Sequence, residues 1–184
     1  ILETFTDHHE IRIALDAGKH MAQGIPIAAF MSFGVDGTTL NGLRPEDVAA
    51  HLSEAGADIV GANCSTGPHA MFDTMQRMCR STSIPVGAMP NAGAPRVVDG
   101  RTMYMATPDY MSKFAKRYIV AGVQLIGGCC GTTPAMIHEV AMSVKALSPS
   151  RIKVVTPEAP EADKPLDSIP REKLSPFAAK LSRG

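Results

Sequence analysis

The chain contains no tryptophan, and aromatic residues make up only 5% of its 184 residues. Proteins that bind single-stranded nucleic acid stack bases on aromatic side chains, so this scarcity argues against such a role. An excess of charge of one sign is lacking as well, because 18 basic residues are matched by 18 acidic ones. A nucleic-acid-binding domain usually carries a basic footprint. Nucleic acid is therefore excluded as the expected partner.

Long apolar runs are also missing. No stretch approaches the roughly 20 residues that a membrane-spanning helix needs, and the first residues show no charged region followed by an apolar segment and a cleavage site. A hydrophobic content of 45% fits a globular core rather than a disordered chain. We therefore expect a cytoplasmic protein that does not contact membranes.

Cysteine is scarce, with four residues in the whole chain. Two of them, Cys129 and Cys130, are adjacent and therefore poorly placed to bridge each other. The chain is neither small nor cysteine-dense, as disulfide-stabilised secreted domains are. We interpret the cysteines as reduced thiols, which leaves them available for metal binding or chemistry.

The adjacent cysteines stand in residues 123–134, which read as strand, turn and helix. The apolar run 123–126 is a short strand, and two glycines then allow a tight backbone. Thr132 or Thr133 can cap a helix whose first turn suits Pro134. The cysteine pair therefore sits at the carboxyl end of a strand, where parallel α/β proteins collect their ligands.

Cys64 stands in a similar place, at the end of the apolar run in residues 57–68. In a barrel of parallel strands the strand ends lie close together, so Cys64 can meet Cys129 and Cys130. Three converging sulfur ligands favour zinc and leave a fourth position open. The alternative is that all three are buried structural cysteines, since free cysteine is often buried. We expect Cys79, on a helix among methionines, to be core packing.

Strand and helix patterns alternate along the chain. We expect strands at 1–5, 26–33, 57–61, 84–89 and from 123, and helices at 7–21, 45–54, 68–79, 107–120 and 134–147. Residues 97–104 carry the Asp-Gly signal of a hairpin, with a loop as an equal possibility. Regular alternation of this kind is typical of parallel βαβ units.

Five strands are fewer than the eight of a closed barrel of this type, which has about 250 residues. Three interpretations stay open: a fragment, a chain that another chain completes, or a smaller doubly wound sheet. After Ser148 the composition changes to prolines among charged residues, with little apolar periodicity. We therefore predict a domain at 1–147 and a linker at 148–184, which has a short helix at 175–181 and the start of a possible following module.

Three motifs, taken in their order, resemble those of the homocysteine S-methyltransferase family. They are Gly61-Ala-Asn-Cys64, Pro90-Asn-Ala-Gly93 and Gly127-Gly-Cys-Cys-Gly-Thr-Thr-Pro134. The resemblance covers about residues 1–147. It implies a (β/α)8 barrel of which this chain holds the last five βα units, without the family's first three strands.

The same resemblance implies a site. In this family a zinc ion is bound by one cysteine and a later adjacent pair, which here are Cys64, Cys129 and Cys130. Glu3 resembles the glutamate that holds the amino group of the substrate, and Asn91 lies in a motif lining the same mouth. The implied reaction is methyl transfer to the thiol of homocysteine, giving methionine, with zinc activating the thiolate. No catalytic residue beyond the zinc site is predicted.

The resemblance says less about the methyl donor. The Pro-Asn-Ala-Gly and Val-Asp-Gly-Arg stretches look more like cobalamin-dependent methionine synthases and bifunctional proteins than betaine-dependent enzymes. Residues 173–184 resemble the opening of a methylenetetrahydrofolate reductase module. The implied donor is methylcobalamin or a methylated folate route, with a cobalamin, folate or reductase module as partner. The alternative is a non-catalytic half-barrel or assembly module that needs another chain.

Overall fold

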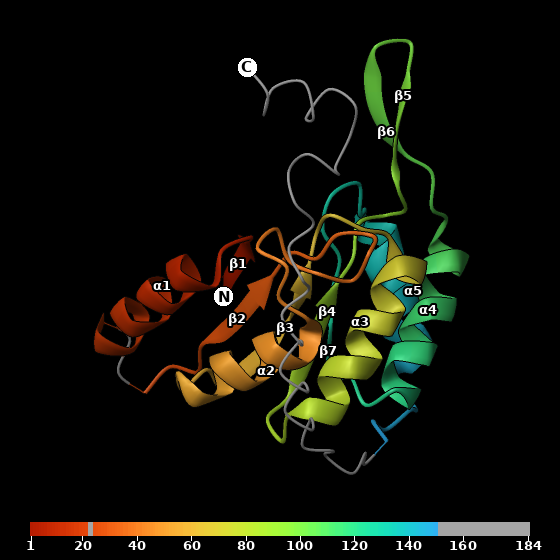
Figure 1. Ribbon diagram of the computed structural model, residues 1–184. Coiled ribbons are helices and arrows are strands. Elements are labelled where there is room, and N and C mark those ends of the chain that lie inside the picture. Colours follow the sequence, from red (N-terminus) through yellow and green to blue (C-terminus); the bar gives the residue numbers. More distant parts are fainter. Residues whose placement is uncertain (22–23, 151–184) are drawn as a thin grey trace, which may run out of the picture.

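The computed structural model describes residues 1–21 and 24–150 and contains a five-stranded sheet whose strands follow chain order (Figure 1). Each strand pairs in parallel with the next. The strands are β1 (Leu2–Phe5), β2 (Ala28–Met31), β3 (Ile59–Asn63), β4 (Val86–Met89) and β7 (Leu125–Ile126). The predicted parallel α/β architecture is confirmed.

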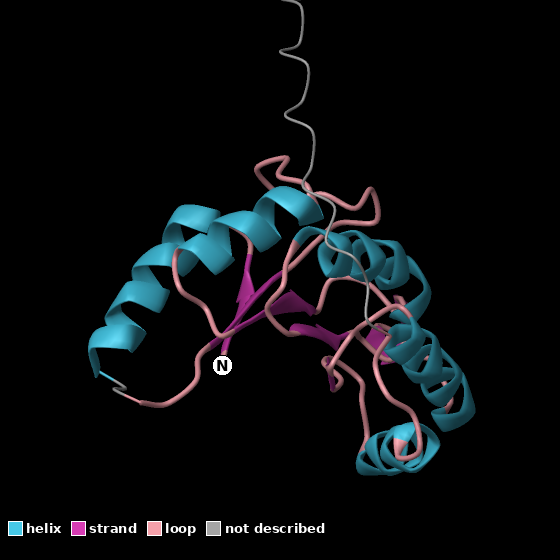
Figure 2. Ribbon diagram, turned by 90° about the horizontal axis from the view of Figure 1, so that it is seen from below, coloured by secondary structure: helices cyan, strands magenta, loops and turns pink. Residues whose placement is uncertain are grey.

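Five helices follow the five strands: α1 (His8–Met21), α2 (Pro45–Glu54), α3 (Pro68–Ser81), α4 (Pro108–Val120) and α5 (Pro134–Val144). Proline opens four of them, where its missing N–H costs nothing. Figure 2 shows the helices on the outer side of the curved sheet. A doubly wound sheet has helices on both faces, so this arrangement is that of five consecutive βα units of a barrel.

A ring on the neighbouring strand β2 explains why β3 contains small residues. We predicted a strand at 57–61, but β3 runs to Asn63 and so includes residues that resemble a turn in the sequence. The ring of Phe30, in β2, lies across Gly61 and Gly87, and a Cβ at Gly61 would come within 2.8 Å of that ring. Glycine is therefore required here by packing, and it does not end the strand. The last helix ends at Val144, before the predicted residue 147.

Hydrophobic residues between the sheet and the helices form the main core. Alternate residues of β2 and β3, including Met31 and Val60, pack there against fully buried helix residues such as Leu52 and Met75. A second cluster, smaller, joins α4 and α5 under the cysteine loop. The core thus fixes the strands from the helical side and leaves their carboxyl ends to carry the polar residues.

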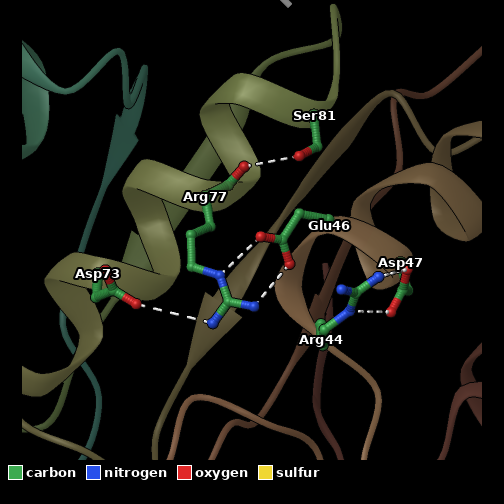
Figure 3. Close-up of polar contacts among 6 residues, drawn as sticks. All are labelled: Arg44, Glu46, Asp47, Asp73, Arg77 and Ser81. Carbon is green, nitrogen blue, oxygen red and sulfur yellow. Dashed lines mark hydrogen bonds and ion pairs between the residues drawn. The ribbon is translucent and has the colours of Figure 1, made fainter. Parts of the chain in front are cut away.

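Ion pairs connect the helices on the outside. Arg77 of α3 donates two hydrogen bonds of 2.8 Å to the Glu46 carboxylate of α2 (Figure 3). Asp73 lies 3.8 Å from the same guanidinium, and Arg44 pairs with Asp47 at the start of α2. The Arg77–Glu46 pair therefore joins α2 and α3, whereas the other two pairs lie within one helix or at its start, and all lie away from the strand ends.

A hairpin between β4 and α4 projects away from the sheet (Figure 1). It consists of β5 (Pro95–Val98) and β6 (Arg101–Tyr104), paired antiparallel. Asp99 and Gly100 have φ angles of 50° and 74°, as a two-residue turn of this kind requires. The hairpin, rather than the loop, is the structure adopted at 97–104.

Among the described residues, no helix is both long and apolar enough to span a bilayer. The helix predicted at 175–181 lies outside the described residues, as does nearly all of the predicted linker at 148–184. The division into a domain at 1–147 and a following segment therefore stays a prediction.

Candidate metal centre

Two loops bring the three predicted cysteines together. Cys64 directly follows β3, and the adjacent pair follows β7. Both loops are held by the end of β4: the Cys64 N–H donates to the Met89 carbonyl at 3.1 Å, and the Cys129 N–H donates to the Pro90 carbonyl at 2.8 Å. β4 lies between β3 and β7 in the sheet, so it serves as the support on which both cysteine loops rest.

The sulfur atoms of Cys64, Cys129 and Cys130 all lie within 4.8 Å of one another. The Cys64 and Cys130 sulfurs are 3.7 Å apart and the thiols are free. Zn–S bonds of about 2.3 Å in a tetrahedron place two sulfurs roughly 3.8 Å apart, which fits this spacing. Among the described residues, this is the one group of three that could hold a metal ion.

The backbone at Cys64 is strained. Cys64 and Ser65 have φ angles of 61° and 58°, a region that residues with a Cβ rarely adopt. The Thr66 N–H donates to the Cys64 carbonyl at 2.6 Å and closes this tight turn. Such strain costs on the order of 1–3 kcal/mol per residue and gathers at functional sites. Here it turns the Cys64 side chain towards the loop after β7.

Asn91 lies beneath the cysteine pair. Its side chain is nearly buried, and its amide oxygen accepts a hydrogen bond of 3.1 Å from the Cys130 N–H. The Ala92 N–H donates in turn to the Cys130 carbonyl at 2.8 Å. The motif that suggested a substrate contact therefore also fixes the backbone of Cys130. A direct contact of Asn91 with substrate stays a prediction.

Glu3 lies in an irregular part of β1. The pairing with β2 shifts between Leu2 and Phe5, so that two residues, Glu3 and Thr4, oppose one. Thr4 has a φ angle of 66°, and the Glu3 side chain is exposed. Bulges of this kind redirect side chains next to active sites. Glu3 is thus exposed in β1, and the next residue, Thr4, contacts Asn63 at the end of β3.

Sequence reasoning missed two residues that contact the cysteines. Asn63 lies 3.9 Å from the Cys129 sulfur through its amide nitrogen. Tyr104, at the base of the hairpin, packs its ring on Gly131 and lies beside Cys130, whose pKa it influences. The Asn63 contact depends on strand register and the Tyr104 contact on the hairpin, neither of which a motif reveals. The position of Asn63 next to Cys64 was the available signal for that residue.

The two adjacent thiols differ in acidity. Burial raises the pKa of Cys129 to about 11. Hydrogen bonds from Cys64 and from the Tyr104 hydroxyl hold the pKa of Cys130, which is exposed, below its ordinary value. The same contact raises the pKa of the Tyr104 hydroxyl. A metal ion bound to all three sulfurs must therefore displace protons, most of all from Cys129.

A polar hollow lies beside the cysteine cluster. It has a volume of about 540 Å³ and is lined by residues that follow β1 and β2, together with Ser65 next to Cys64. Its walls include the hydroxyl-bearing residues Thr6, Ser32 and Thr38 and the backbone at Gly34 and Gly42. The hollow offers hydrogen-bonding groups for a small polar ligand at the edge of the sulfur cluster.

Comparison with known proteins gives a family for this geometry. Residues 1–144 match the family model for homocysteine S-methyltransferase. The chain is 38% identical over 129 residues to methionine synthase of Mycobacterium tuberculosis, covering 70% of this chain and 10% of that protein. It is 33% identical over 145 residues to the S-methylmethionine–homocysteine S-methyltransferase of Rattus norvegicus, covering 70% of this chain and 39% of that protein.

Solved structures agree on the fold. The apo form of the homocysteine methyltransferase MmuM from Escherichia coli superposes with a TM-score of 0.61 at 22% identity, over 77% of this chain and 48% of that one. Its metallated form gives a TM-score of 0.58 at 24% identity, over 76% and 43%. The chain thus spans less than half of these relatives. With the family model matching residues 1–144, the chain belongs to the homocysteine S-methyltransferase family.

Proposed function

We propose that this chain carries the metal- and substrate-binding part of a zinc-dependent homocysteine S-methyltransferase, which transfers a methyl group to the homocysteine thiol and forms methionine. The observation that carries the proposal is the cluster of Cys64, Cys129 and Cys130, with sulfurs within 4.8 Å of one another. Family membership supports it independently, because the matched family is defined by this activity.

The sulfur cluster fits zinc by ligand type and spacing. Three cysteine sulfurs are soft ligands, which select zinc over hard cations such as magnesium. When bound, zinc supplies Lewis-acid stabilisation of a thiolate at neutral pH, where a free thiol with a pKa near 8.5 is mostly protonated. The chain's own contribution is to hold the three sulfurs on one side. The backbone N–H groups of the cysteines donate to Met89, Pro90 and Asn91, and these hydrogen bonds fix both loops.

The amino-acid end of homocysteine requires groups of opposite charge. We assign the substrate ammonium to Glu3, which is exposed at the end of β1. The carboxylate of the substrate would be held at the rim of the polar hollow, by Ser65 next to Cys64, because the Thr38 N–H and hydroxyl already donate to Asp36 within the hollow. Asn91, beneath Cys130, completes the predicted substrate contacts. These assignments place the substrate thiol towards the cysteines.

The methyl donor is proposed to be methylcobalamin or a methylated folate route. One relative named above is a methionine synthase, and this chain matches a tenth of that protein. The proposal therefore includes further modules, for cobalamin, folate or methylenetetrahydrofolate reduction, linked through residues 148–184. The relative from Rattus norvegicus is named for S-methylmethionine, which makes this compound the competing donor to be tested.

The test is methionine formation from homocysteine by a protein containing this chain, with methylcobalamin and with S-methylmethionine as alternative donors. We expect turnover with methylcobalamin, and Cys130→Ser should abolish it. Cys79→Ala is the matched control, because Cys79 is buried away from the cluster. Full activity of Cys130→Ser would contradict the proposal. An inactive protein that still binds homocysteine would favour the non-catalytic assembly module.

A further inference from the structure

Asn63 is the last residue of β3, and its side chain is fully buried. Its amide oxygen accepts a hydrogen bond of 2.8 Å from the backbone N–H of Thr4. Its amide nitrogen donates to the Thr4 hydroxyl at 2.7 Å and to the Cys129 sulfur at 3.9 Å. One side chain on β3 thus contacts both β1 and the loop after β7.

The orientation of this amide is fixed by its partners. A backbone N–H can only donate, so the oxygen of Asn63 must face Thr4 N. The two N–H groups are then left for the Thr4 hydroxyl and the Cys129 sulfur, and each hydrogen finds one acceptor. The Ser32 hydroxyl also donates to the Asn63 carbonyl at 2.9 Å and holds the backbone from the side of β2. The amide therefore has one position in which its side-chain donors and acceptor are all used.

At one end, these bonds hold the irregular part of β1. Thr4 has a φ angle of 66°, a costly conformation that persists only where its surroundings impose it. The Asn63 amide accepts one hydrogen bond from the Thr4 N–H and donates another to the Thr4 hydroxyl, so both bonds act on Thr4 itself. Glu3 precedes Thr4, so the direction of the Glu3 side chain depends on this backbone. Asn63 thereby sets where the exposed carboxylate points.

At the other end, the amide donates to a metal-binding sulfur. Cys129 is the more buried of the adjacent pair, where a thiolate loses hydration and needs hydrogen-bond donors. Partners outside the ligand shell of a metal orient the ligands and stabilise their charge, and their removal typically lowers metal affinity about 10–100-fold. The N–H of Asn63 is placed for this function at Cys129.

We propose that Asn63 is a positioning residue that couples the site for the substrate ammonium at Glu3 to the metal-binding sulfur of Cys129. The inference rests on the proposed function, since it assigns Glu3 to the substrate ammonium and Cys129 to zinc. The Asn63 amide positions both Glu3 and Cys129. It therefore fixes the distance between the carboxylate that binds the ammonium and the metal that binds the thiol. A substrate of the length of homocysteine is selected by that distance.

The first test measures zinc affinity on folded protein, by chelator competition, for the parent and for Asn63→Leu. The leucine matches the amide in size but makes none of its hydrogen bonds. We expect zinc affinity to fall about 10-fold or more, and the sulfur-to-metal charge-transfer band of the cobalt-substituted protein to shift. Thr4→Val is the matched control, because at the β1 end it removes the hydroxyl contact of Asn63 and keeps the bond from the backbone N–H, so zinc affinity should stay unchanged. Asn63→Ser serves as the second variant if Asn63→Leu does not fold.

The second test measures coupling to the substrate. Homocysteine affinity of the zinc-loaded protein is measured by calorimetry for the parent, Glu3→Gln, Asn63→Leu and the double variant. We expect Glu3→Gln to weaken binding less in the Asn63→Leu background than in the parent, because contacting groups are non-additive. Additive effects, or unchanged zinc affinity in a zinc-binding Asn63→Leu protein, would overturn the role of Asn63 alone. A parent that binds no zinc would overturn the proposed function as well.

Discussion

Cys79 and Cys130 carry the same side chain in two different parts of the molecule. Cys79 lies in α3, in the hydrophobic core, where burial raises the pKa of its thiol to about 12. Cys130 is exposed at the strand ends, 3.7 Å from the Cys64 sulfur. In the helical layer the thiol is a small apolar group that fills space, whereas at the strand ends it is one of three sulfurs that lie close enough together to hold a metal ion.

The polar residues of the two regions differ in the same way. Arg77 and Glu46 in the helical layer face each other with two hydrogen bonds, and both charges are matched (Figure 3). At the strand ends, Glu3 is exposed and the backbone is strained at Thr4 and Cys64. Stability is concentrated where charges pair and apolar groups pack. The groups that could bind a ligand are instead at the strand ends, where the backbone holds exposed side chains in place.

The largest expected effect separates the two kinds of cysteine. Cys64→Ala removes one of three ligands, so methionine formation should fall at least about 100-fold while the protein stays folded. Cys79→Ala should lower the free energy of unfolding by about 1 kcal/mol and leave the turnover number unchanged. Activity assays and denaturant titrations on both variants check this. A Cys79→Ala protein that loses activity while folded would break the comparison.

Glu3→Gln tests whether the exposed carboxylate is held for a partner. The substitution keeps the size of the side chain and removes its charge. Hydrogen bonds to charged groups contribute about 1.5–3 kcal/mol, so the dissociation constant for homocysteine should rise roughly 10–100-fold. Glu10→Gln, in the first turn of α1, is a matched control and should change nothing. Calorimetric titration with homocysteine measures both variants, and equal affinities would remove Glu3 from the site.

Arg77→Met tests whether a matched ion pair stabilises the helical layer. The methionine keeps an apolar stem and leaves Glu46, which is mostly buried, without its partner. We expect a loss of about 1–3 kcal/mol in the free energy of unfolding, between the values for exposed and buried pairs. Zinc binding should be unchanged because the pair lies outside the strand ends. Urea denaturation measures the loss. Lys113 pairs with Asp109 within α4, where both side chains are exposed, so Lys113→Met is the reference variant. An equal destabilisation of the two variants would mean that the Arg77–Glu46 pair does not hold α2 and α3 together.

The pH dependence of stability gives the smallest effect. Burial by itself would raise the pKa of Glu46, but the hydrogen bonds and positive charge of Arg77, together with a backbone hydrogen bond and the charge of Arg44, outweigh it and hold the pKa below its ordinary value of 4.5. A carboxyl with a lower pKa in the folded state stabilises the fold above its unfolded pKa. This contribution is lost as pH falls through the folded pKa. Urea midpoints from pH 7 to pH 3 should therefore decline less steeply in Glu46→Gln than in the parent.

Much of the fold could be predicted from local patterns. Prolines at helix starts, apolar runs and their alternation define the five βα units, because these signals act over a few residues. The meeting of Cys64 with Cys129 and Cys130 followed from strand ends converging in a barrel. The three sulfurs alone favoured zinc but left buried structural cysteines as an alternative; the resemblance strengthened the zinc prediction and added the expected substrate.

The remaining features depend on contacts between distant residues. The end of β3 was misplaced because Gly61 looks like a turn residue until Phe30 is placed over it. The contacts of Asn63 join residues 59 and 66 positions away and depend on an irregular pairing in β1. Tyr104 reaches Cys130 only because residues 95–104 form a hairpin. None of these follows from a pattern within one stretch of sequence.

The most direct test of the central claim is the zinc content per chain of the reduced protein, measured for the parent, Cys130→Ser and Cys79→Ala after dialysis against a weak chelator. The account predicts one zinc per chain in the parent, one in Cys79→Ala and none in Cys130→Ser. Zinc retained by Cys130→Ser, or absent from the folded parent, would contradict the claim that the three strand-end cysteines form a metal centre.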